Sequence, residues 1–273
     1  MCPVVSVCMP VYNGRAYIRK AVDSVLAQSM EDFELLICDD CSSDDTLDIV
    51  ESYDDPRIRV FRNENNLGLV GNWNKVISYA RGKYIKLMMQ DDILGADALK
   101  SQVSLLESNP KAVLSIGNTA VIDGNDNVIM KRHRFKRDTV IDGRKYARRS
   151  LRGRNIYCEP PNHMYKREMI SKIGIYDDSL IYTPDWDYCL LLSEIGDVAC
   201  TSTEVMRFRI SDSQKTSDIY RGSTAAANKD SYQMFIKHWK SGILGLNGFD
   251  YFMFRTVIRA AALVRIALLH FKK

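Results

Sequence analysis

The sequence predicts an α/β fold in which a mostly parallel sheet is covered by helices on both faces. Short apolar runs alternate with segments of helical period over about the first hundred residues, and turn residues such as Asn13-Gly14 separate them. Several of the apolar runs are followed directly by acidic residues. This alternation is typical of strand–helix–strand units, whose parallel strands bind ligands beyond their carboxyl ends.

The regular part of the chain gives its elements in order. Apolar residues over 4–9 predict a first strand ended by Pro10, and a helix follows whose apolar face contains Ile18, Ala21, Val22, Val25 and Leu26. A second strand is expected over 33–38 and a third over 58–61, with a helix capped by Ser42 or Ser43 between them. A helix from Asn72 to about Ala80 precedes the apolar run over 84–89.

The later elements are less regular. Strands are expected over 112–116 and 119–122, and the sequence DGNDN predicts a turn before Val128. Residues 131–154 are rich in Lys and Arg and show no clear period, so we expect a mobile loop with a short helix there. A strand over 164–166, a helix through Ile173 and a helix opened by Pro184 complete the pattern.

Composition excludes several classes of protein. The chain has 46% hydrophobic and 26% charged residues with a net charge of +4, an excess too small to indicate a nucleic-acid partner. The amino terminus has no secretory signal, and we expect a cytoplasmic location. Seven cysteines indicate reduced thiols, and the pair Cys38 and Cys41 lacks the second pair that a zinc site needs.

Two adjacent carboxylates, Asp91 and Asp92, follow the apolar run over 84–89. Their charges repel each other at the partly desolvated end of a sheet, so a positive group should lie beside them. A divalent cation prefers hard oxygen ligands and would offset this repulsion. The same edge should gather the other residues that follow strands, namely Tyr12, Asp39 and Asp40.

The segments SVCMPVYNG, ICDDCSSDDT, QDDIL and TPDWDYCLLL together resemble the inverting family 2 glycosyltransferases across roughly residues 4–217. The resemblance implies the A-type nucleotide-sugar transferase fold, a three-layer, Rossmann-like mixed sheet. It further implies a metal-assisted hexosyltransferase that uses Mn2+ or Mg2+. We therefore expect a catalytic domain over 1–217 and a C-terminal helical extension over 218–273.

The resemblance assigns residues to the nucleotide. It places Tyr12 against a uracil ring and Asp39 and Asp40 at the base or ribose, where the uracil N3 hydrogen suits a carboxylate. Asp44 fits the third acid of that motif, although capping of the next helix is an equally good interpretation. The expected nucleotide-binding residues are Pro10, Tyr12, Asp39, Asp40, Asp44, Asn74, Lys75, Gln90, Asp91 and Arg209.

The metal and the catalytic base are also implied by the resemblance. Asp91 and Asp92 match the end of the family's D-x-D metal motif, but Met89 stands where its first acid often lies, so we expect a weakly held cation. Asp185 resembles the base that takes the acceptor hydroxyl's proton in an inverting transfer. Asp187 is the alternative base, and its simpler interpretation is a solvated acid on a helix.

Other residues near these motifs have less specific assignments. Arg209 or Lys215 is expected to neutralise the leaving diphosphate, while Ser211 occupies the place of the family's histidine. His163 could meet an acceptor, but its simpler interpretation is structural. Trp186 is interpreted as a core or pocket-wall residue rather than as a platform for a sugar.

The C-terminal segment over 249–273 has two open interpretations. Arg255, Arg259 and Arg265 interrupt it too often for a spanning helix, which needs ~20 mostly apolar residues. It either lies in a membrane interface as an amphipathic anchor, helped by the basic residues over 131–154, or packs on the catalytic domain or a partner subunit.

The main functional hypothesis is a transferase that moves a sugar from a UDP-linked donor to a hydroxyl of a glycan or lipid-linked acceptor in bacterial-type surface polysaccharide synthesis. The alternative is a nucleotide-binding or scaffold protein of the same fold that has lost turnover. The departures at Met89 and Ser211 motivate this alternative.

Overall fold

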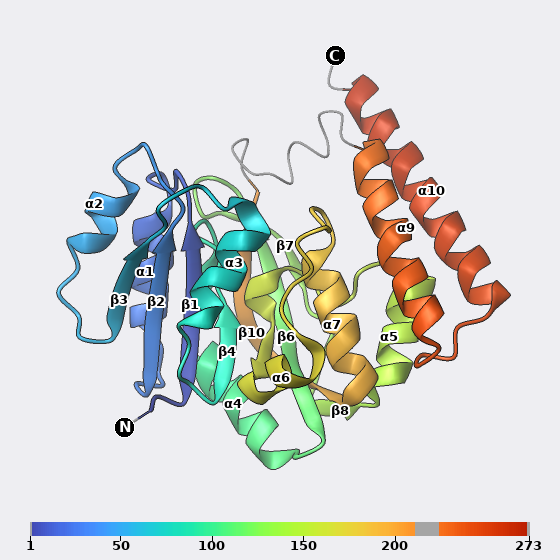
Figure 1. Ribbon diagram of the computed structural model, residues 1–273, viewed down its shortest axis with the longest axis horizontal. Coiled ribbons are helices and arrows are strands. Elements are labelled where there is room, and N and C mark those ends of the chain that lie inside the picture. Colours follow the sequence, from blue (N-terminus) through green and yellow to red (C-terminus); the bar gives the residue numbers. More distant parts are fainter. Residues whose placement is uncertain (1, 211–223, 272–273) are drawn as a thin grey trace.

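The computed structural model describes residues 2–210 and 224–271, with side chains described as far as residue 260. It confirms the expected α/β class, with one mixed, mostly parallel sheet between layers of helices (Figure 1). The strand order is β3-β2-β1-β4-β9-β6-β10-β5, with β7 paired to β6 and β8 to β10. The expectations for Ser211 and Lys215 and the boundary between residues 217 and 218 lie outside the described residues.

The first part of the chain follows the predicted alternation. Its elements are β1 (Val5–Val11), α1 (Ile18–Leu26), β2 (Phe33–Asp39), α2 (Thr46–Glu51), β3 (Ile58–Arg62), α3 (Gly68–Ser78) and β4 (Tyr84–Leu87). The four strands are parallel. The expected cap at Ser42 or Ser43 is wrong, because α2 begins at Thr46 after Asp45.

The strand order reverses between β1 and β4. Strand β1 pairs with β2 along its whole length, but its pairing with β4 covers only Val5 to Cys8. Pro10 lies in the part of β1 beyond this second ladder, where its missing N–H breaks no β4 pairing. The carboxyl ends of β1 and β4 therefore meet at a topological switch point, the usual ligand position in open α/β sheets.

The second part of the chain completes the sheet and its helices. Its strands are β5 (Ile93–Leu94), β6 (Ala112–Ile122), β7 (Val128–Arg132), β8 (Thr139–Ile141), β9 (Met164–Lys166) and β10 (Asp197–Arg209). Its helices are α4 (Ala98–Ser108), α5 (Gly143–Arg152), α6 (Ile170–Ile173) and α7 (Pro184–Ile195), with single 3-10 turns at Pro160–Asn162 and Arg167–Met169. The two strands expected over 112–122 form one continuous strand.

The expectation for residues 131–154 is confirmed for a short helix, α5, but not for a mobile loop. Most of this stretch forms the end of β7, strand β8 and helix α5. The side chain of Asp142 caps α5 by accepting a hydrogen bond from the backbone N–H of Lys145 at 2.9 Å. The buried face of α5 has helical spacing, and the Arg and Lys residues between its members hid this period in the sequence: Tyr146, Ala147, Ser150 and Leu151.

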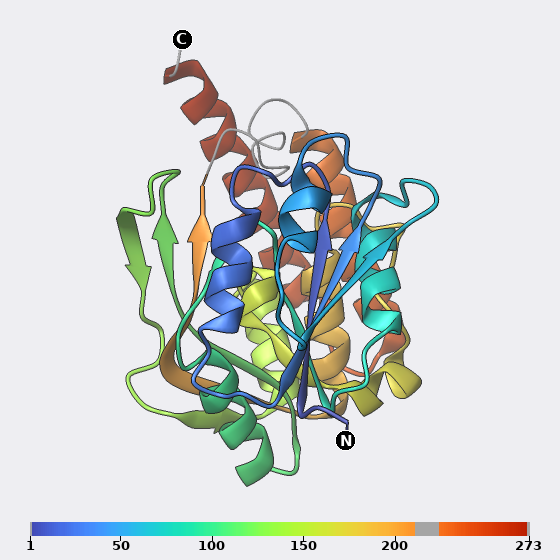
Figure 2. The ribbon, with the colours of Figure 1, turned by 90° about the vertical axis from the view of Figure 1, so that its left-hand side faces the viewer.

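Two hydrophobic cores hold the layers together. Helices α1, α2 and α4 contribute to the core on one face of the sheet, and helices α3, α5 and α7 to the core on the other. Figures 1 and 2 show α1 and α4 on the face opposite α3. The acidic loops that follow β2 and β4 lie at the carboxyl edge of this sandwich.

Two further helices, α9 (Thr224–Ser241) and α10 (Gly248–Phe271), pack outside α7 and α5 (Figure 1). Asp187 of α7 is 1% exposed and accepts hydrogen bonds from Lys237 Nζ at 2.7 Å and His238 Nε2 at 3.0 Å. The interpretation of Asp187 as a solvated acid is therefore wrong. His238 Nδ1 lies 2.6 Å from Glu194 Oε1, and Asp250 of α10 pairs with Arg148 and Arg152 of α5.

Within residues 2–210 and 224–271, no helix is long and apolar enough to cross a membrane.

Replacing His238 by Gln should destabilise the protein most at low pH. Burial alone would lower the pKa of His238, but hydrogen bonds to Asp187 and Glu194 raise it above its ordinary value of 6.5. A raised folded-state pKa means that this stabilisation is complete below pH 6.5 and is lost as the pH rises through the folded pKa. We expect a loss of about 3 kcal/mol below pH 6.5, measured by urea unfolding across a pH series.

The control variant is His133→Gln, because His133 is exposed and lies 3.8 Å from Glu204. It should change the free energy of unfolding little at any pH. A His238→Gln variant as stable as the wild type at low pH would contradict the assignment.

Candidate active site

The loops after β1 and β4 are fastened to each other by Gln90. Its Oε1 accepts a hydrogen bond from the backbone N–H of Tyr12 at 2.8 Å, and its Nε2 donates to the carbonyl of Tyr12 at 3.0 Å. Gly14 allows this close approach, because a Cβ there would lie 2.6 Å from Gln90 Oε1. The clamp leaves the Tyr12 side chain 48% exposed at the sheet edge. Gln90 thus shapes the site through the backbone of Tyr12.

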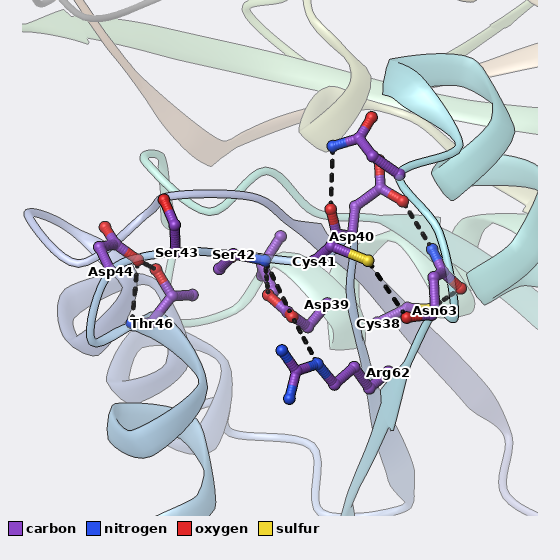
Figure 3. A network of polar contacts seen from close by, with 12 residues as sticks. Cys38, Asp39, Asp40, Cys41, Ser42, Ser43, Asp44, Thr46, Arg62 and Asn63 are labelled. Carbon is purple, nitrogen blue, oxygen red and sulfur yellow. Dashed lines mark hydrogen bonds and ion pairs between the residues drawn. The ribbon is translucent and has the colours of Figure 1, made fainter.

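Asp40 is committed to the scaffold of the loop after β2 (Figure 3). Its Oδ1 accepts hydrogen bonds from Asn63 Nδ2 and from the backbone N–H of Leu67, both at 2.8 Å. Its Oδ2 accepts from the backbone N–H of Gly68 at 3.0 Å, at the start of α3. Because both carboxylate oxygens hold the protein's own donors in a buried position, a direct contact with a base would have to compete with these bonds.

Asp39 and Asp44 also hold the turn between β2 and α2 (Figure 3). Asp39 is fully buried, accepts a hydrogen bond from the backbone N–H of Ser42 at 3.1 Å and lies 3.8 Å from Arg62 Nε. Asp44 accepts hydrogen bonds from the backbone N–H and hydroxyl of Thr46. Burial acts to raise the pKa of Asp44, but these hydrogen bonds hold it below its ordinary value. Asp44 thus binds the first residue of α2, although the N-cap position itself is Asp45.

Asn74 and Lys75 lie on α3 with different roles. The side-chain amide of Asn74 donates to the carbonyl of Tyr176 at 2.9 Å. It also accepts a hydrogen bond from the backbone N–H of Tyr176 at 3.0 Å. Asn74 thus fastens the segment before α7 to α3. Lys75 is exposed, and its Nζ lies 5.3 Å from the ring centroid of Tyr79. Of the two, Lys75 presents its side chain to solvent.

Asp92 and Arg209 form a buried link between the end of β4 and β10. Asp92 accepts a hydrogen bond from the backbone N–H of Arg209 at 2.9 Å. Burial raises the pKa of Asp92 well above its ordinary value, and the charge of Asp91 adds to this. The Arg209 side chain has 0% exposure, donates to the carbonyl of Asp91 at 2.7 Å and pairs with Asp126. The Arg209 guanidinium therefore holds the loops after β4 and β6 together.

Asp91 is the half-buried member of the acidic pair. Its carboxylate is therefore the more accessible oxygen donor at the end of β4, with Asp92 buried behind it. Among the described residues there is no group of three or more His, Cys, Asp or Glu arranged to hold a metal ion. A cation at this edge would need oxygen ligands from a bound substrate or water as well.

Asp185 lies in the first turn of α7, directly after Pro184, and is half-buried. Burial raises the pKa of Asp185 to about 7; a hydrogen bond from the backbone N–H of Trp186 opposes this, and the charge of Glu159 adds to it. A carboxyl group with such a pKa is well suited to accept a proton near neutral pH. Asp187, two residues later, faces α9 instead.

Trp186 and His163 are structural, as expected. Trp186 is 5% exposed and donates from Nε1 to Ser150 Oγ at 2.8 Å. His163 is buried, with its Nε2 lying 2.9 Å from the carbonyl of Tyr157, and burial lowers the pKa of His163 to about 3.

Glu159 belongs to the site but was not recognised in the sequence. It lies between α5 and β9, and its Oε1 pairs with Arg132 Nη1 of β7 at 2.6 Å. Its charge contributes to raising the pKa of both Asp92 and Asp185, so it lies within electrostatic reach of both. In the sequence, its only local signal is the pair of prolines that follows it. In the structure, the preceding Cys158 has a positive φ of 69°.

The comparisons with known proteins agree with this architecture. Residues 6–174, more than half of the chain, match the model of Glycosyl transferase family 2. The Escherichia coli UDP-Glc:alpha-D-GlcNAc-diphosphoundecaprenol beta-1,3-glucosyltransferase WfgD is 38% identical over 125 residues, which cover 46% of this chain and 49% of WfgD. An uncharacterized glycosyltransferase of Rickettsia typhi is 29% identical over 222 residues, covering 78% of this chain and 66% of that protein.

A solved structure shows the same fold. S. aureus TarS 1-349 in complex with UDP-GlcNAc superposes with a TM-score of 0.71 at 18% identity, covering 86% of this chain and 66% of that one. At this identity the likeness concerns the fold alone. The chain spans at most about two thirds of the length of these three proteins.

Replacing Asp40 by Asn should destabilise the protein. The amide can offer only one acceptor oxygen, so at least one of the donors from Asn63, Leu67 and Gly68 would face an NH2 group. We expect a loss of about 2 kcal/mol in the free energy of unfolding, measured by urea titration. Asp45→Asn is the matched control, because Asp45 is exposed and its side chain makes no capping bond. Equal stability of the two variants would contradict the scaffold role.

Proposed function

This chain belongs to glycosyl transferase family 2, and on that premise we propose that it transfers a sugar from a UDP-linked donor to a hydroxyl of a glycan or lipid-linked acceptor, with inversion. The observation that supports this most is Asp185, a half-buried carboxyl group with a pKa raised to about 7. The charge of Glu159 acts on Asp185 and also on Asp92 of the acidic pair at the end of β4. This common neighbour supports a proton acceptor close to the predicted diphosphate position.

In this reaction Asp185 accepts the proton of the acceptor hydroxyl as its oxygen attacks the anomeric carbon. The bond between that carbon and the diphosphate oxygen breaks on the opposite face, and the nucleoside diphosphate leaves with the bonding electrons. One carboxylate is sufficient for this displacement. Asp187 is not assigned a chemical step, because Lys237 and His238 already hold its carboxylate.

Donor binding rests on the loops that follow β1 and β2. The exposed ring of Tyr12 offers a surface on which a uracil base can lie, and Gln90 fixes the backbone that carries it. Asp39 and Asp40 act by positioning this edge, since their carboxylates bind the protein's own groups. The assignment to UDP is supported by WfgD, whose name gives UDP-Glc as its donor, and by TarS, whose structure is a complex with UDP-GlcNAc.

The residues present fit a Mn2+ or Mg2+ ion held with the substrate. Such ions are commonly bound by one or two carboxylates together with substrate phosphates and waters, so a three-residue protein site is not required. Asp91 would hold the ion, and Asp92 lies buried beside it. When bound, the ion would neutralise charge on the departing diphosphate. UDP affinity that is unchanged by Mn2+ and by Asp91→Asn would exclude this role.

The acceptor side of the proposal involves α10. Phe249 and Phe252 are about 60% exposed at its start, and Arg255 and Arg259 lie exposed further along. A hollow of about 420 Å³ between α9 and α10 is lined by Tyr232, Tyr251 and both of these arginines, among others. Aromatic and basic side chains together suit the cytoplasmic face of an anionic membrane, where a lipid-linked acceptor would lie. Equal sedimentation with anionic and neutral vesicles would contradict this.

The second candidate is a nucleotide-binding protein without turnover. The observation that favours it is Met89 in place of the first acid of the metal motif. Tight UDP binding with no transfer or hydrolysis, with either metal and any acceptor, would support it over the transferase.

Asp185→Asn should abolish turnover while leaving UDP binding intact. An amide cannot accept the proton, and loss of a general base lowers rates about 10²–10⁴-fold. In the wild type, kcat/KM for the UDP-sugar should rise with pH and level off above about 7, because the base must be deprotonated. UDP release, measured over a pH series with Mn2+, tests both expectations.

The matched control is Asp178→Asn, because Asp178 is an exposed acid shortly before α7. It should retain wild-type activity and the same pH profile. Full activity of Asp185→Asn, or a profile that falls on raising the pH through 7, would sink the assignment of Asp185 as the base.

A further inference from the structure

Side-chain hydrogen bonds hold the loop that carries Glu159. Asn162 donates from Nδ2 to the carbonyl of Tyr157 at 2.9 Å, and its Oδ1 accepts from the backbone N–H of Gly117 at 2.7 Å. Asn155 Oδ1 accepts from the backbone N–H of Tyr157 at 2.9 Å. These bonds tie the loop to itself and to β6, so the backbone of Glu159 is held in place between them.

Only one of the two carboxylate oxygens of Glu159 has a hydrogen-bond partner among the described residues. Its Oε1 pairs with one nitrogen of Arg132, whereas its Oε2 is buried and has no hydrogen-bond partner among the described residues. A buried carboxylate oxygen without a donor is costly and rare in folded proteins. If the pair served only to fasten β7 to the loop, the guanidinium could bind both oxygens, as arginine and carboxylate groups commonly do.

The position of Glu159 identifies which ligand group could supply the missing donor. Its charge acts on Asp92 at the end of β4 and on Asp185 at the start of α7. In the proposed reaction the diphosphate lies near Asp92 and the proton acceptor is Asp185. The donor sugar therefore lies between these two residues. The sugar's hydroxyl groups are hydrogen-bond donors that a carboxylate accepts well.

We propose that Glu159, held by Arg132, is the residue that binds a hydroxyl of the donor sugar through its Oε2. This proposal rests on the proposed function and names the group that recognises the sugar part of the donor. Arg132 is a positioning residue, since its Nη1 fixes Oε1 and leaves Oε2 for the sugar. The nucleotide is bound elsewhere, at the loops after β1 and β2.

Binding measurements separate the sugar contact from catalysis. Because Glu159 also raises the pKa of Asp185, its replacement changes turnover for a second reason, and affinity is the cleaner readout. We expect Glu159→Gln to bind a UDP-sugar about ten-fold to a hundred-fold more weakly than the wild type, as for loss of one charged hydrogen bond. Its affinity for UDP alone should stay within about two-fold. Isothermal titration with UDP, UDP-glucose, UDP-galactose and UDP-GlcNAc gives these values.

Deoxy analogues of the donor give a second test, and its first part uses only the wild-type protein. For the UDP-sugar that binds best, one monodeoxy analogue should bind the wild type about ten-fold more weakly than the parent UDP-sugar does. The Glu159→Gln variant should bind the parent and this analogue equally. Glu107→Gln is the matched control, because Glu107 pairs with Lys83 at the surface. It should bind every ligand as the wild type does.

The outcomes distinguish this inference from the function on which it rests. Unchanged UDP-sugar affinity in Glu159→Gln, or an equal loss for UDP and UDP-sugars, would overturn the sugar contact while leaving the transferase intact. A loss confined to acceptor binding would likewise overturn it. A wild type that binds none of these nucleotides would overturn both.

Discussion

The structure depends on the reversal of strand order between β1 and β4. Because β4 pairs with β1 only as far as Cys8, the chain that follows β4 is free to turn away from the last residues of β1. Gln90 then bridges the two diverging ends through both backbone groups of Tyr12. The positions of the exposed Tyr12 ring and of the Asp91 carboxylate both follow from this divergence of β1 and β4. No equivalent edge would exist if the two strands paired along their full length.

Carboxylates concentrated at one edge of a sheet must be neutralised or kept apart, and the protein does this unevenly. Asp40 accepts hydrogen bonds from the backbone N–H groups of Leu67 and Gly68, and Asp92 accepts one from the backbone N–H of Arg209. These acids support the loops around them. Asp185 is only half-buried and its pKa is raised to about 7. Burial raises the pKa of Asp92 as well, but Asp92 lies inside the fold, whereas the partly exposed Asp185 can reach a substrate and is therefore the better chemical candidate.

Sequence reasoning located the first four strands because each is a short run rich in apolar residues. In β1, β2 and β4 this pattern reflects burial on both faces, whereas the edge strand β3 is only half-buried. It expected only a short helix within a loop where α5 lies, because arginines and lysines interrupt the buried face of α5, and it did not identify β10. It also treated Asp187 as solvated, because the cation partners come from α9, some fifty residues later. Glu159 was missed for the same reason: Arg132 and Asp185 are distant in sequence, and only the folded sheet brings their effects together.

Helix α7 links the candidate active site to the C-terminal helices. Residues two apart on a helix point in different directions, so Asp185 and Asp187 can serve separate surfaces from one turn. The carboxylate of Asp187 is hydrogen-bonded to His238 of α9. Glu194, further along α7, is hydrogen-bonded to the same histidine. Both side chains are buried, so α7 cannot rotate or slide without breaking charged hydrogen bonds away from water. Helix α9 therefore fixes the orientation of the helix whose first turn presents Asp185.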